Sequence, residues 1–352
     1  MTGVDIAAGG HRPPRHNFFD HTRLIAAWLV FLSHHYALLG LPQPTMCVDS
    51  LMAGIGVGMF FSLSGYLVSH SLLADPHAGR FLARRALRIY PGLIVNVLLC
   101  LLVLGPLMSV LPLAEYWTQP QLPEYLRNLL MAPRFDLPGV FADNPYPTAV
   151  NGSLWTLPFE VLAYLTLCLT AMLIGVAHHR QIVLILWLVS LLLAVFWQPP
   201  TPLVVWDNDL RHLPRLFALF FGGALLVHYG QVLLRAGWLL SLVVFLALGS
   251  ALQPALCLPA ALFVLPLLTI YFGAQPVAAR FVPASDCSYG IYIYAFPVQQ
   301  TVIALAGPWG FWPTFVLAAG MTWLLAWLSW HLVEQPALRL KPRRPLRQAV
   351  AT

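Results

Sequence analysis

The sequence predicts an all-α integral membrane protein with about ten transmembrane helices. Hydrophobic residues make up 59% of its 352 residues, charged residues make up 9%, and the mean hydropathy is +0.75. A soluble domain has roughly 25% charged residues, so this chain carries too few charges to cover a water-facing surface. Uncharged stretches such as residues 93–110 and 182–197 recur along the chain, and a membrane span needs about 20 apolar residues.

Ten apolar stretches, separated by Pro, Gly and charged residues, are candidate spans. An even number of spans places both termini on one side of the membrane. We therefore expect a cytoplasmic tail at residues 1–17, a transmembrane domain at residues 18–336 and a basic cytoplasmic tail at residues 337–352. The candidate spans are residues 18–39, 51–74, 89–111, 152–176, 181–197, 213–229, 236–252, 255–273, 287–306 and 311–333.

The basic residues set the orientation of these spans. Fifteen of the 19 Lys and Arg residues fall on one predicted side, which the positive-inside rule identifies as the cytoplasm. The net charge of +6 is therefore interpreted as topology, and no nucleic-acid partner is expected. The largest outer connection, about residues 113–151, is long enough to form a lid. The Cys residues show no metal-ligand spacing, so no metal site is expected, and no sequence feature specifies an oligomeric state.

The first span carries ionisable groups at membrane depth, where such groups are rare and usually functional. Asp20 and Arg23 are three residues apart and can pair at the cytoplasmic end. His34 follows Arg23 by eleven residues, or three turns on the same face, which places its imidazole roughly 16 Å inward. His34 is a candidate general base toward a hydroxyl. His35 is an alternative base, and a structural histidine bound to a neighbouring helix is the alternative to catalysis.

Two more spans carry polar groups at depth. Glu160 lies nine residues into the fourth span, roughly 14 Å deep, where its carboxylate could orient an imidazole. A buried structural Glu is the alternative. The second span combines glycines with Ser62 and Ser64, a pattern typical of tightly packed helices, and a ligand-facing role for either serine is the less favoured reading.

A basic cluster lies between the second and third spans. Arg84 and Arg88 are four residues apart and share a helical face, while Arg85 points elsewhere. Two guanidinium groups on one face suit the phosphates of a nucleotide-like donor. Contact with anionic lipid headgroups explains the same spacing equally well.

Together these residues resemble the acyltransferase-3 family, the integral membrane O-acyltransferases of bacterial envelope and exported polysaccharides. The resemblance spans nearly the whole chain, and six short elements follow one another in the family order. Two positions depart from it, because Gly58 stands where an acid is frequent and Ala295 where a His is frequent. The matching elements are Asp20, Arg23 and His34; Gly56 to Gly65; Arg84 and Arg88 with Tyr90-Pro91; Leu154 to Glu160; Ser288 to Tyr292; and Glu334-Gln335-Pro336.

The resemblance implies an O-acetyltransferase of the bacterial inner membrane that uses acetyl-CoA or another acyl-CoA as donor. The implied acceptor is a hydroxyl of an envelope or exported polysaccharide or of a lipid-linked glycan. The implied catalytic set is His34, Glu160, Asp20 and Arg23, in which His34 either takes the proton of the acceptor hydroxyl or carries the acyl group transiently. The implied donor set is Arg84, Arg88, Arg85 and Tyr90. Substrate contacts are implied at Ser64, Trp155 and Tyr292, with packing the alternative for the two aromatic residues.

A transporter of a glycan or of an acylated intermediate is the alternative function. Proton relays inside membranes are also built from His and Glu, so the intramembrane charges alone fit either class.

Overall fold

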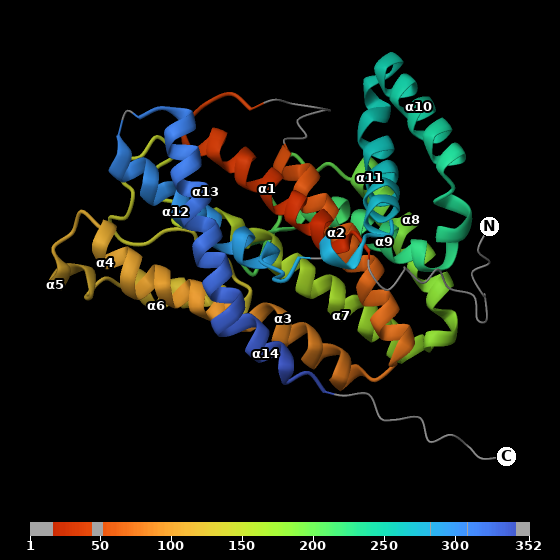
Figure 1. Cartoon of the computed structure of the whole chain (residues 1–352), viewed down its shortest axis with the longest axis horizontal. Coiled ribbons are helices and arrows are strands. Elements are labelled where there is room, and N and C mark those ends of the chain that lie inside the picture. Colours follow the sequence, from red (N-terminus) through yellow and green to blue (C-terminus); the bar gives the residue numbers. More distant parts are fainter. Residues whose placement is uncertain (1–16, 44–51, 282, 308, 343–352) are drawn as a thin grey trace.

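The computed structural model describes residues 17–43, 52–281, 283–307 and 309–342. These residues form an elongated bundle of helices, with one two-stranded hairpin of β1 (Val204–Val205) and β2 (Asn208–Asp209). Figure 1 shows α1 and α2 in the middle of the bundle, α12 and α13 towards one end, and α10 projecting at the other. The predicted N-terminal tail lies outside the described residues except for residue 17, and the predicted C-terminal tail is described over residues 337–342, of which 337–339 belong to a helix.

A helix lies at each of the ten positions predicted as spans. The helix α3 begins eleven residues before its predicted span, and α9 ends four residues after its predicted span. A 3₁₀ turn or a π turn extends some of the others at one end. The ten long helices are α1 (Phe19–Leu38), α2 (Met52–Ala74), α3 (Ala78–Leu99), α7 (Leu157–Ile174), α8 (His179–Phe196), α9 (Leu213–Leu233), α10 (Ala236–Leu252), α11 (Cys257–Gly273), α12 (Ser288–Ala306) and α13 (Phe311–Ser329).

Short elements connect these helices. The π turn η1 (Cys100–Leu104) continues α3 into α4 (Gly105–Met108), and the π turn η8 (Trp330–Glu334) continues α13 into α14 (Gln335–Arg339). The outer connection is ordered by α5 (Leu113–Tyr116), α6 (Gln121–Tyr125) and the 3₁₀ turn η2 (Leu126–Leu130). The other 3₁₀ turns are η3 (Gly152–Thr156), η4 (Val176–His178), η5 (Leu210–His212), η6 (Pro254–Leu256) and η7 (Ala279–Phe281).

Within the described part of the chain, six helical segments are long and apolar enough to cross a membrane. The helices α10 and α11 are apolar but shorter, at 17 residues each. The protein is therefore a multi-pass membrane protein, while the count of ten spans and the placement of the termini stay predictions. The six segments are Met52–Ala74, Ala78–Met108, Gly152–Ile174, Val176–Phe196, Leu210–Leu233 and Phe311–Arg339.

Close packing of α2 against α1 and α9 organises the centre of the bundle. A Cβ atom at Gly56 would lie 2.6 Å from the Ala26 carbonyl oxygen on α1, and one at Gly65 would overlap the Phe220 carbonyl on α9. A Cβ atom at Gly223 of α9 would in turn overlap the backbone of Ser62. The glycines predicted to allow helix approach do so here, because any larger residue would push these helices apart.

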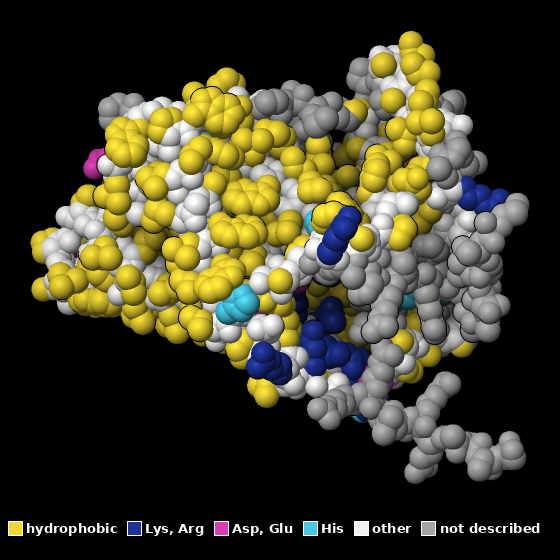
Figure 2. Space-filling model, in the orientation of Figure 1, with side chains coloured by type: hydrophobic (Ala, Val, Ile, Leu, Met, Phe, Trp, Pro, Cys, Tyr) yellow, Lys and Arg dark blue, Asp and Glu magenta, His cyan; other side chains and the backbone are white. Residues whose placement is uncertain are grey.

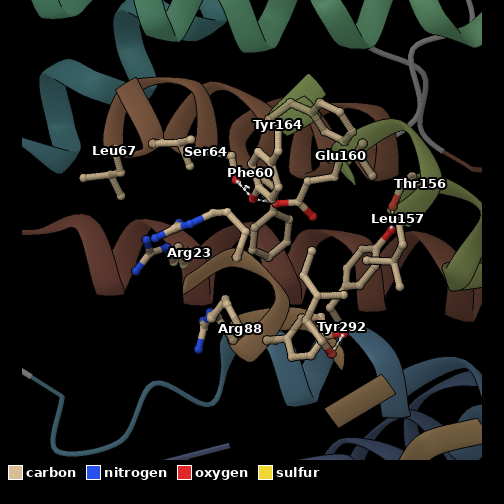
Figure 3. A pocket seen from close by; sticks show the side chains of 17 residues that line it. Arg23, Phe60, Ser64, Leu67, Arg88, Thr156, Leu157, Glu160, Tyr164 and Tyr292 are labelled. Carbon is tan, nitrogen blue, oxygen red and sulfur yellow. Dashed lines mark hydrogen bonds between the residues drawn. The ribbon is translucent and has the colours of Figure 1, made fainter. Parts of the chain in front are cut away.

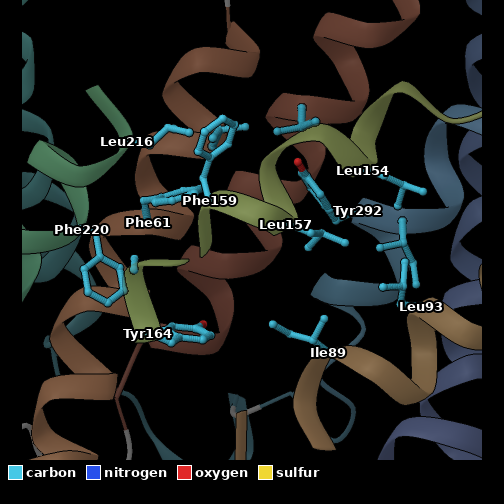
Figure 4. Packing of buried hydrophobic residues seen from close by; sticks show 14 of the residues in the cluster. Phe61, Ile89, Leu93, Leu154, Leu157, Phe159, Tyr164, Leu216, Phe220 and Tyr292 are labelled. Atoms are coloured by element: carbon cyan, nitrogen blue, oxygen red, sulfur yellow. The ribbon is translucent and has the colours of Figure 1, made fainter. Parts of the chain in front are cut away.

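The largest buried cluster joins α2, α3, α7, α9 and α12 around the middle of the bundle (Figure 4). Hydrophobic side chains also cover most of the face shown in Figure 2, as expected for a protein in contact with lipid. Basic side chains gather beside a hollow near the lower edge of that face.

Candidate functional site

A cavity lies between α1, α2, α3, α7 and α12 (Figure 3). Its empty space, counted with the opening to solvent, is about 720 Å³. Apolar walls come mainly from Val57, Phe60, Phe61, Ile89 and Leu157. Polar groups lie at three places along these walls. Three arginines form one end, the Glu160 carboxylate lies between, and the hydroxyls of Thr156 and Tyr292 form the other end.

Three guanidinium groups form the arginine end, from Arg23 on α1 and from Arg85 and Arg88 on α3. The predicted ion pair of Arg23 with Asp20 is present, with 3.0 Å between Nη1 and Oδ1. Arg88 is held by Asp286. Arg85 has no carboxylate at ion-pair distance among the described residues, and its buried Nε has no hydrogen-bond partner. Arg85 is therefore the cavity guanidinium most available to an anion.

Asp286, in the connection before α12, ties the arginine end together. Its Oδ2 lies 2.7 Å from Arg88 Nη2 and 3.6 Å from Arg23 Nη1, and its Oδ1 accepts a 2.6 Å hydrogen bond from the Ser288 hydroxyl. Burial raises the pKa of Asp286, but Arg88 and Arg23 outweigh it and lower the pKa to about 2. The carboxylate is therefore ionised at neutral pH and fixes two of the three arginines.

Glu160 enters the cavity from the first turn of α7. Its Oε1 accepts hydrogen bonds from the Ser64 hydroxyl at 2.8 Å and from the Tyr164 hydroxyl. The two hydroxyls also lie 3.1 Å apart. Such a network fixes the direction of the carboxylate. The structure does not bring Glu160 to His34, because no hydrogen bond joins them among the described residues.

The hydroxyl end is closed by Tyr292 of α12 and Thr156. The Tyr292 hydroxyl donates to the Ser153 carbonyl oxygen at 2.9 Å and accepts from the Thr156 hydroxyl at 2.6 Å. Phe60 packs edge-on against the Tyr292 ring. The substrate contacts expected at Ser64 and Tyr292 therefore line the cavity. Trp155 does not, since it packs against Phe159 and His212.

His34 lies outside the cavity, against Phe296, which is one turn of α12 beyond Tyr292. The two ring centroids are 5.2 Å apart, and the buried Nδ1 of His34 has no hydrogen-bond partner. His35 differs because both ring nitrogens are engaged. Its Nε2 donates to the Phe311 carbonyl oxygen at 3.2 Å, and its Nδ1 lies 3.3 Å from Gln299 Nε2. A nitrogen bonded to a carbonyl must carry the hydrogen, so Nε2 of His35 is the protonated nitrogen and both of its ring nitrogens have partners.

The predicted donor set is divided by the structure. Arg84 and Arg88 do share the helix α3, but Arg84 is buried with Nη1 2.7 Å from Asp75 Oδ2 and does not line the cavity. Arg85 lines it instead, contrary to the expectation that it points elsewhere. Tyr90 is half-buried and does not line the cavity either.

Three residues of the site were missed by sequence reasoning, and two carried a usable signal. Asp286 is the only acidic residue between Asp209 and Glu334, so its presence beside an apolar span was informative. Tyr164 follows Glu160 by four residues and therefore shares its helical face. Thr156 carried no comparable signal, because its role depends on the distant Tyr292.

The comparisons with known proteins agree on one family. The model of an acyltransferase domain matches residues 16–331. The O-acetyl transferase of Shigella phage Sf6 is 34% identical over 351 residues, covering 94% of this chain and 98% of that protein. Nodulation protein 10 of Rhizobium leguminosarum bv. viciae is 31% identical over 371 residues, covering 95% of each. No solved structure matches the chain at a significant level.

The family match covers the helices that build the cavity, and both relatives align along nearly their whole length. It identifies an enzyme and so favours acyl transfer over the transporter considered from the sequence. Among the described residues, no group of three or more His, Cys, Asp or Glu side chains is placed to hold a metal ion. The chain belongs to the acyltransferase family of integral membrane enzymes.

Proposed function

We propose that the protein is an O-acetyltransferase of the bacterial inner membrane, which moves the acetyl group of acetyl-CoA to a hydroxyl of an envelope, exported or lipid-linked carbohydrate. The relative named O-acetyl transferase supports the acyl group. The observation that carries the proposal is the cavity with three guanidinium groups at one end and a hydrogen-bonded carboxylate inside.

The arginine end suits the phosphates of CoA. Arg85, Arg88 and Arg23 offer several planar N–H donors, which pair with phosphate oxygens more specifically than lysines do. Asp286 holds two of them in place, so little side-chain entropy is lost when the donor binds. Contact of Arg84 with the donor is not part of this proposal, because Arg84 does not line the cavity and its Nη1 is paired with Asp75.

The walls beyond the arginines suit the pantetheine arm. Phe60, Phe61 and Leu157 supply apolar surface, and Ser64 and Glu160 supply polar atoms for the amides of the arm. The thioester then lies toward Tyr292. His34, on α1, contacts Phe296, which is one turn of α12 beyond Tyr292, so the acetyl group must pass the Tyr292 end of the cavity to reach the imidazole.

The proposed transfer requires only the acceptor hydroxyl, the thioester and one protein base. The acceptor hydroxyl oxygen attacks the acetyl carbonyl carbon, a C–O ester bond forms and the C–S bond of the thioester breaks. His34 takes the hydroxyl proton, and that proton passes to the CoA thiolate that leaves. The free Nδ1 of His34 supports this role, and the engaged nitrogens of His35 argue against it as the base.

Donor binding and transfer are tested separately. A ligand at 100 times its Kd adds about 2.7 kcal/mol to stability, so acetyl-CoA should raise the melting temperature of the purified protein. Arg85→Ala should reduce this rise, and Arg280→Ala, an exposed arginine outside the cavity, should not. Absence of any rise with the wild-type protein would refute the donor.

Transfer is measured by mass spectrometry of the glycans from cells that express the wild-type or the His34→Ala protein. We expect an acetyl increment on one glycan with the wild type and none with the variant. An undiminished increment with His34→Ala, at equal protein level, would remove His34 from the mechanism.

A further inference from the structure

A second hollow lies in the outer connection, away from the central cavity. It is lined by Gln121, Glu124, Tyr125, Arg134 and Asp136, and its empty space, counted with its opening, is about 500 Å³. Every one of these side chains carries a polar group, whereas the central cavity has apolar walls. The lining therefore suits a polar ligand and does not suit an acyl chain or a lipid tail.

Ion pairs hold one wall of this hollow in a fixed place. Arg134 lies 3.1 Å from Asp207 and 3.7 Å from Glu124, and Arg127 lies 2.7 Å and 2.8 Å from the same two acids. Asp207 belongs to the turn of the β1–β2 hairpin, so four charges join two separate segments of the chain. Such a network fixes a binding wall better than a single exposed pair does.

The backbone of the hollow is also fixed. The side-chain amide of Asn128 donates to the carbonyl oxygens of Tyr125 and Arg134, and its Oδ1 accepts from the Arg134 backbone N–H. The Tyr125 side chain is fully buried and supplies an aromatic part of the lining. The hollow is therefore a preformed feature of the outer connection.

The charges around the hollow disfavour an anionic ligand. The acids Glu124, Asp136 and Asp207 outnumber the bases Arg127 and Arg134 by one. A hydrogen bond from Arg127 lowers the pKa of Glu124, so this acid is ionised at neutral pH. Both guanidinium groups are already paired with carboxylates, and neither is left free for a phosphate or a carboxylate.

Two groups in the hollow remain available. Among the described residues, the Gln121 amide and the Asp136 carboxylate make no hydrogen bond or ion pair with another side chain. An amide offers two donors and an acceptor, and a carboxylate offers only acceptors. A sugar hydroxyl donates and accepts at once, so neighbouring hydroxyls on one ring satisfy this pair.

We propose that the hollow binds a neutral, hydroxyl-rich sugar residue of the acceptor carbohydrate, with Gln121 and Asp136 as its hydrogen-bonding groups. The proposal rests on the proposed function, since it names where the acceptor of that reaction is held. It adds a specificity site in the segment that the sequence places on the outer face.

The position of the hollow suits this role. The backbone of Asp136 pairs with Ala149 in an isolated β-bridge, and Ala149 packs against the cluster of Leu38, Phe296 and Ile303. The Phe296 ring of this cluster contacts His34. The central cavity ends at Tyr292, one turn of α12 before Phe296. Donor and acceptor thus reach His34 along different elements, and a saccharide held at Asp136 can extend along the outer segment toward it.

Gln121→Ala and Asp136→Ala test the proposal in the full-length protein. The matched control is Glu115→Ala, which removes an exposed carboxylate of the same outer connection outside the hollow. The probe is the glycan that gains acetyl groups in cells expressing the protein, prepared from cells that lack it, with lipid-linked and lipid-free saccharide in separate arms.

Each hollow variant should raise the KM for the glycan about tenfold or more, the equivalent of one hydrogen bond to a hydroxyl. The KM for acetyl-CoA and the melting temperature should stay at the wild-type values, as they should in Glu115→Ala. An effect in both arms assigns the hollow to the sugar itself, and an effect confined to the lipid-linked arm assigns it to the sugar next to the lipid.

The two proposals fail in different ways. A wild-type protein that neither binds acetyl-CoA nor acetylates the glycan refutes the proposed function. A wild-type protein that is active, with hollow variants whose glycan KM matches that of Glu115→Ala, refutes only the sugar site.

Discussion

At the scale of single residues, the adjacent histidines of α1 show how packing separates two identical side chains. His35 turns to α12 and α13, where Gln299, Phe311 and Thr314 surround its ring nitrogens. His34 turns to Phe296 and keeps an unpaired nitrogen. The sequence could not decide between them, because neighbouring positions on a helix differ by 100° and the partners lie more than 260 residues away.

Exchange of each histidine for alanine should therefore give opposite results. His35→Ala removes one of two partners from the Phe311 carbonyl and from the Gln299 amide, and it leaves a cavity in place of a fully buried ring, so we expect it to lower stability by about 2 to 4 kcal/mol. His34→Ala should unfold close to the wild-type midpoint while transfer is lost. Thermal unfolding in detergent, followed by the transfer assay on folded protein, checks both; a stable His35→Ala would contradict the assigned network.

The two serines of α2 offer a second matched pair. The Ser64 hydroxyl donates to Glu160, whereas the Ser62 hydroxyl donates to the Gly58 carbonyl within its own helix. Ser64→Ala should lower kcat roughly tenfold, because Glu160 loses one of the two hydroxyls that orient it. Ser62→Ala should stay near the wild-type rate. Equal rates in the two variants, measured at saturating acetyl-CoA, would show that the orientation of Glu160 does not matter for turnover.

At the scale of elements, the start of α3 explains why helical spacing predicted only part of the arginine end of the cavity. The spacing of Arg84 and Arg88 correctly placed them on one helix. Asp75, in the connection from α2, then binds both Arg80 and Arg84 and removes Arg84 from the cavity. A helical pattern cannot reveal this, since the partner lies outside the helix and its position depends on the turn.

The same connection makes a prediction about pH. Hydrogen bonds from Arg80 and then Arg84 hold the pKa of Asp75 well below its usual value. A carboxylate with a depressed pKa stabilises the folded protein above the pKa that it has when unfolded, about 3.9. That stabilisation is lost as the pH falls from there through the folded pKa.

Asp75→Asn should therefore melt several degrees below the wild type at pH 7, and the difference should shrink as the pH is lowered below about 4. Asp143→Asn, an exposed acid of the outer connection with no ion pair among the described residues, should melt with the wild type throughout. A difference between Asp75→Asn and the wild type that is constant with pH would mean that the effect is not due to charge.

At the scale of the whole molecule, composition and apolar runs located the long helices well, because a lipid-facing chain must bury every backbone hydrogen bond within its own segment. The site was predicted less completely. Glu160, Arg23 and Arg88 line the cavity as expected, but Asp286 and Tyr164 were found only through their three-dimensional neighbours. These contacts depend on helix rotation, which the hydropathy of a span does not record.

The ion pairs between distant segments agree with the predicted orientation. Arg88 pairs with Asp286, and the sequence assigns both to the cytoplasmic side. Arg127 and Arg134 pair with Asp207, and the sequence assigns all three to the outer side. These ion pairs do not test whether α10 and α11 cross the membrane. Each helix has 17 residues and spans only about 26 Å, against a hydrocarbon core of about 30 Å.

Single exposed positions can test the orientation and the hairpin at once. With ten spans, Ala142→Cys and Gln253→Cys lie outside and Ala177→Cys lies in the cytoplasm. A membrane-impermeant maleimide applied to intact cells should therefore label the first two variants. It should label Ala177→Cys only after permeabilisation. Wild-type protein gives the background of the native cysteines. Protection of Gln253→Cys alone would show that α10 and α11 do not cross, because a hairpin that stays inside leaves every other segment on its predicted side. Protection of Ala142→Cys would instead reverse the orientation, and with it the assignment of the guanidinium groups to the face where acetyl-CoA is found.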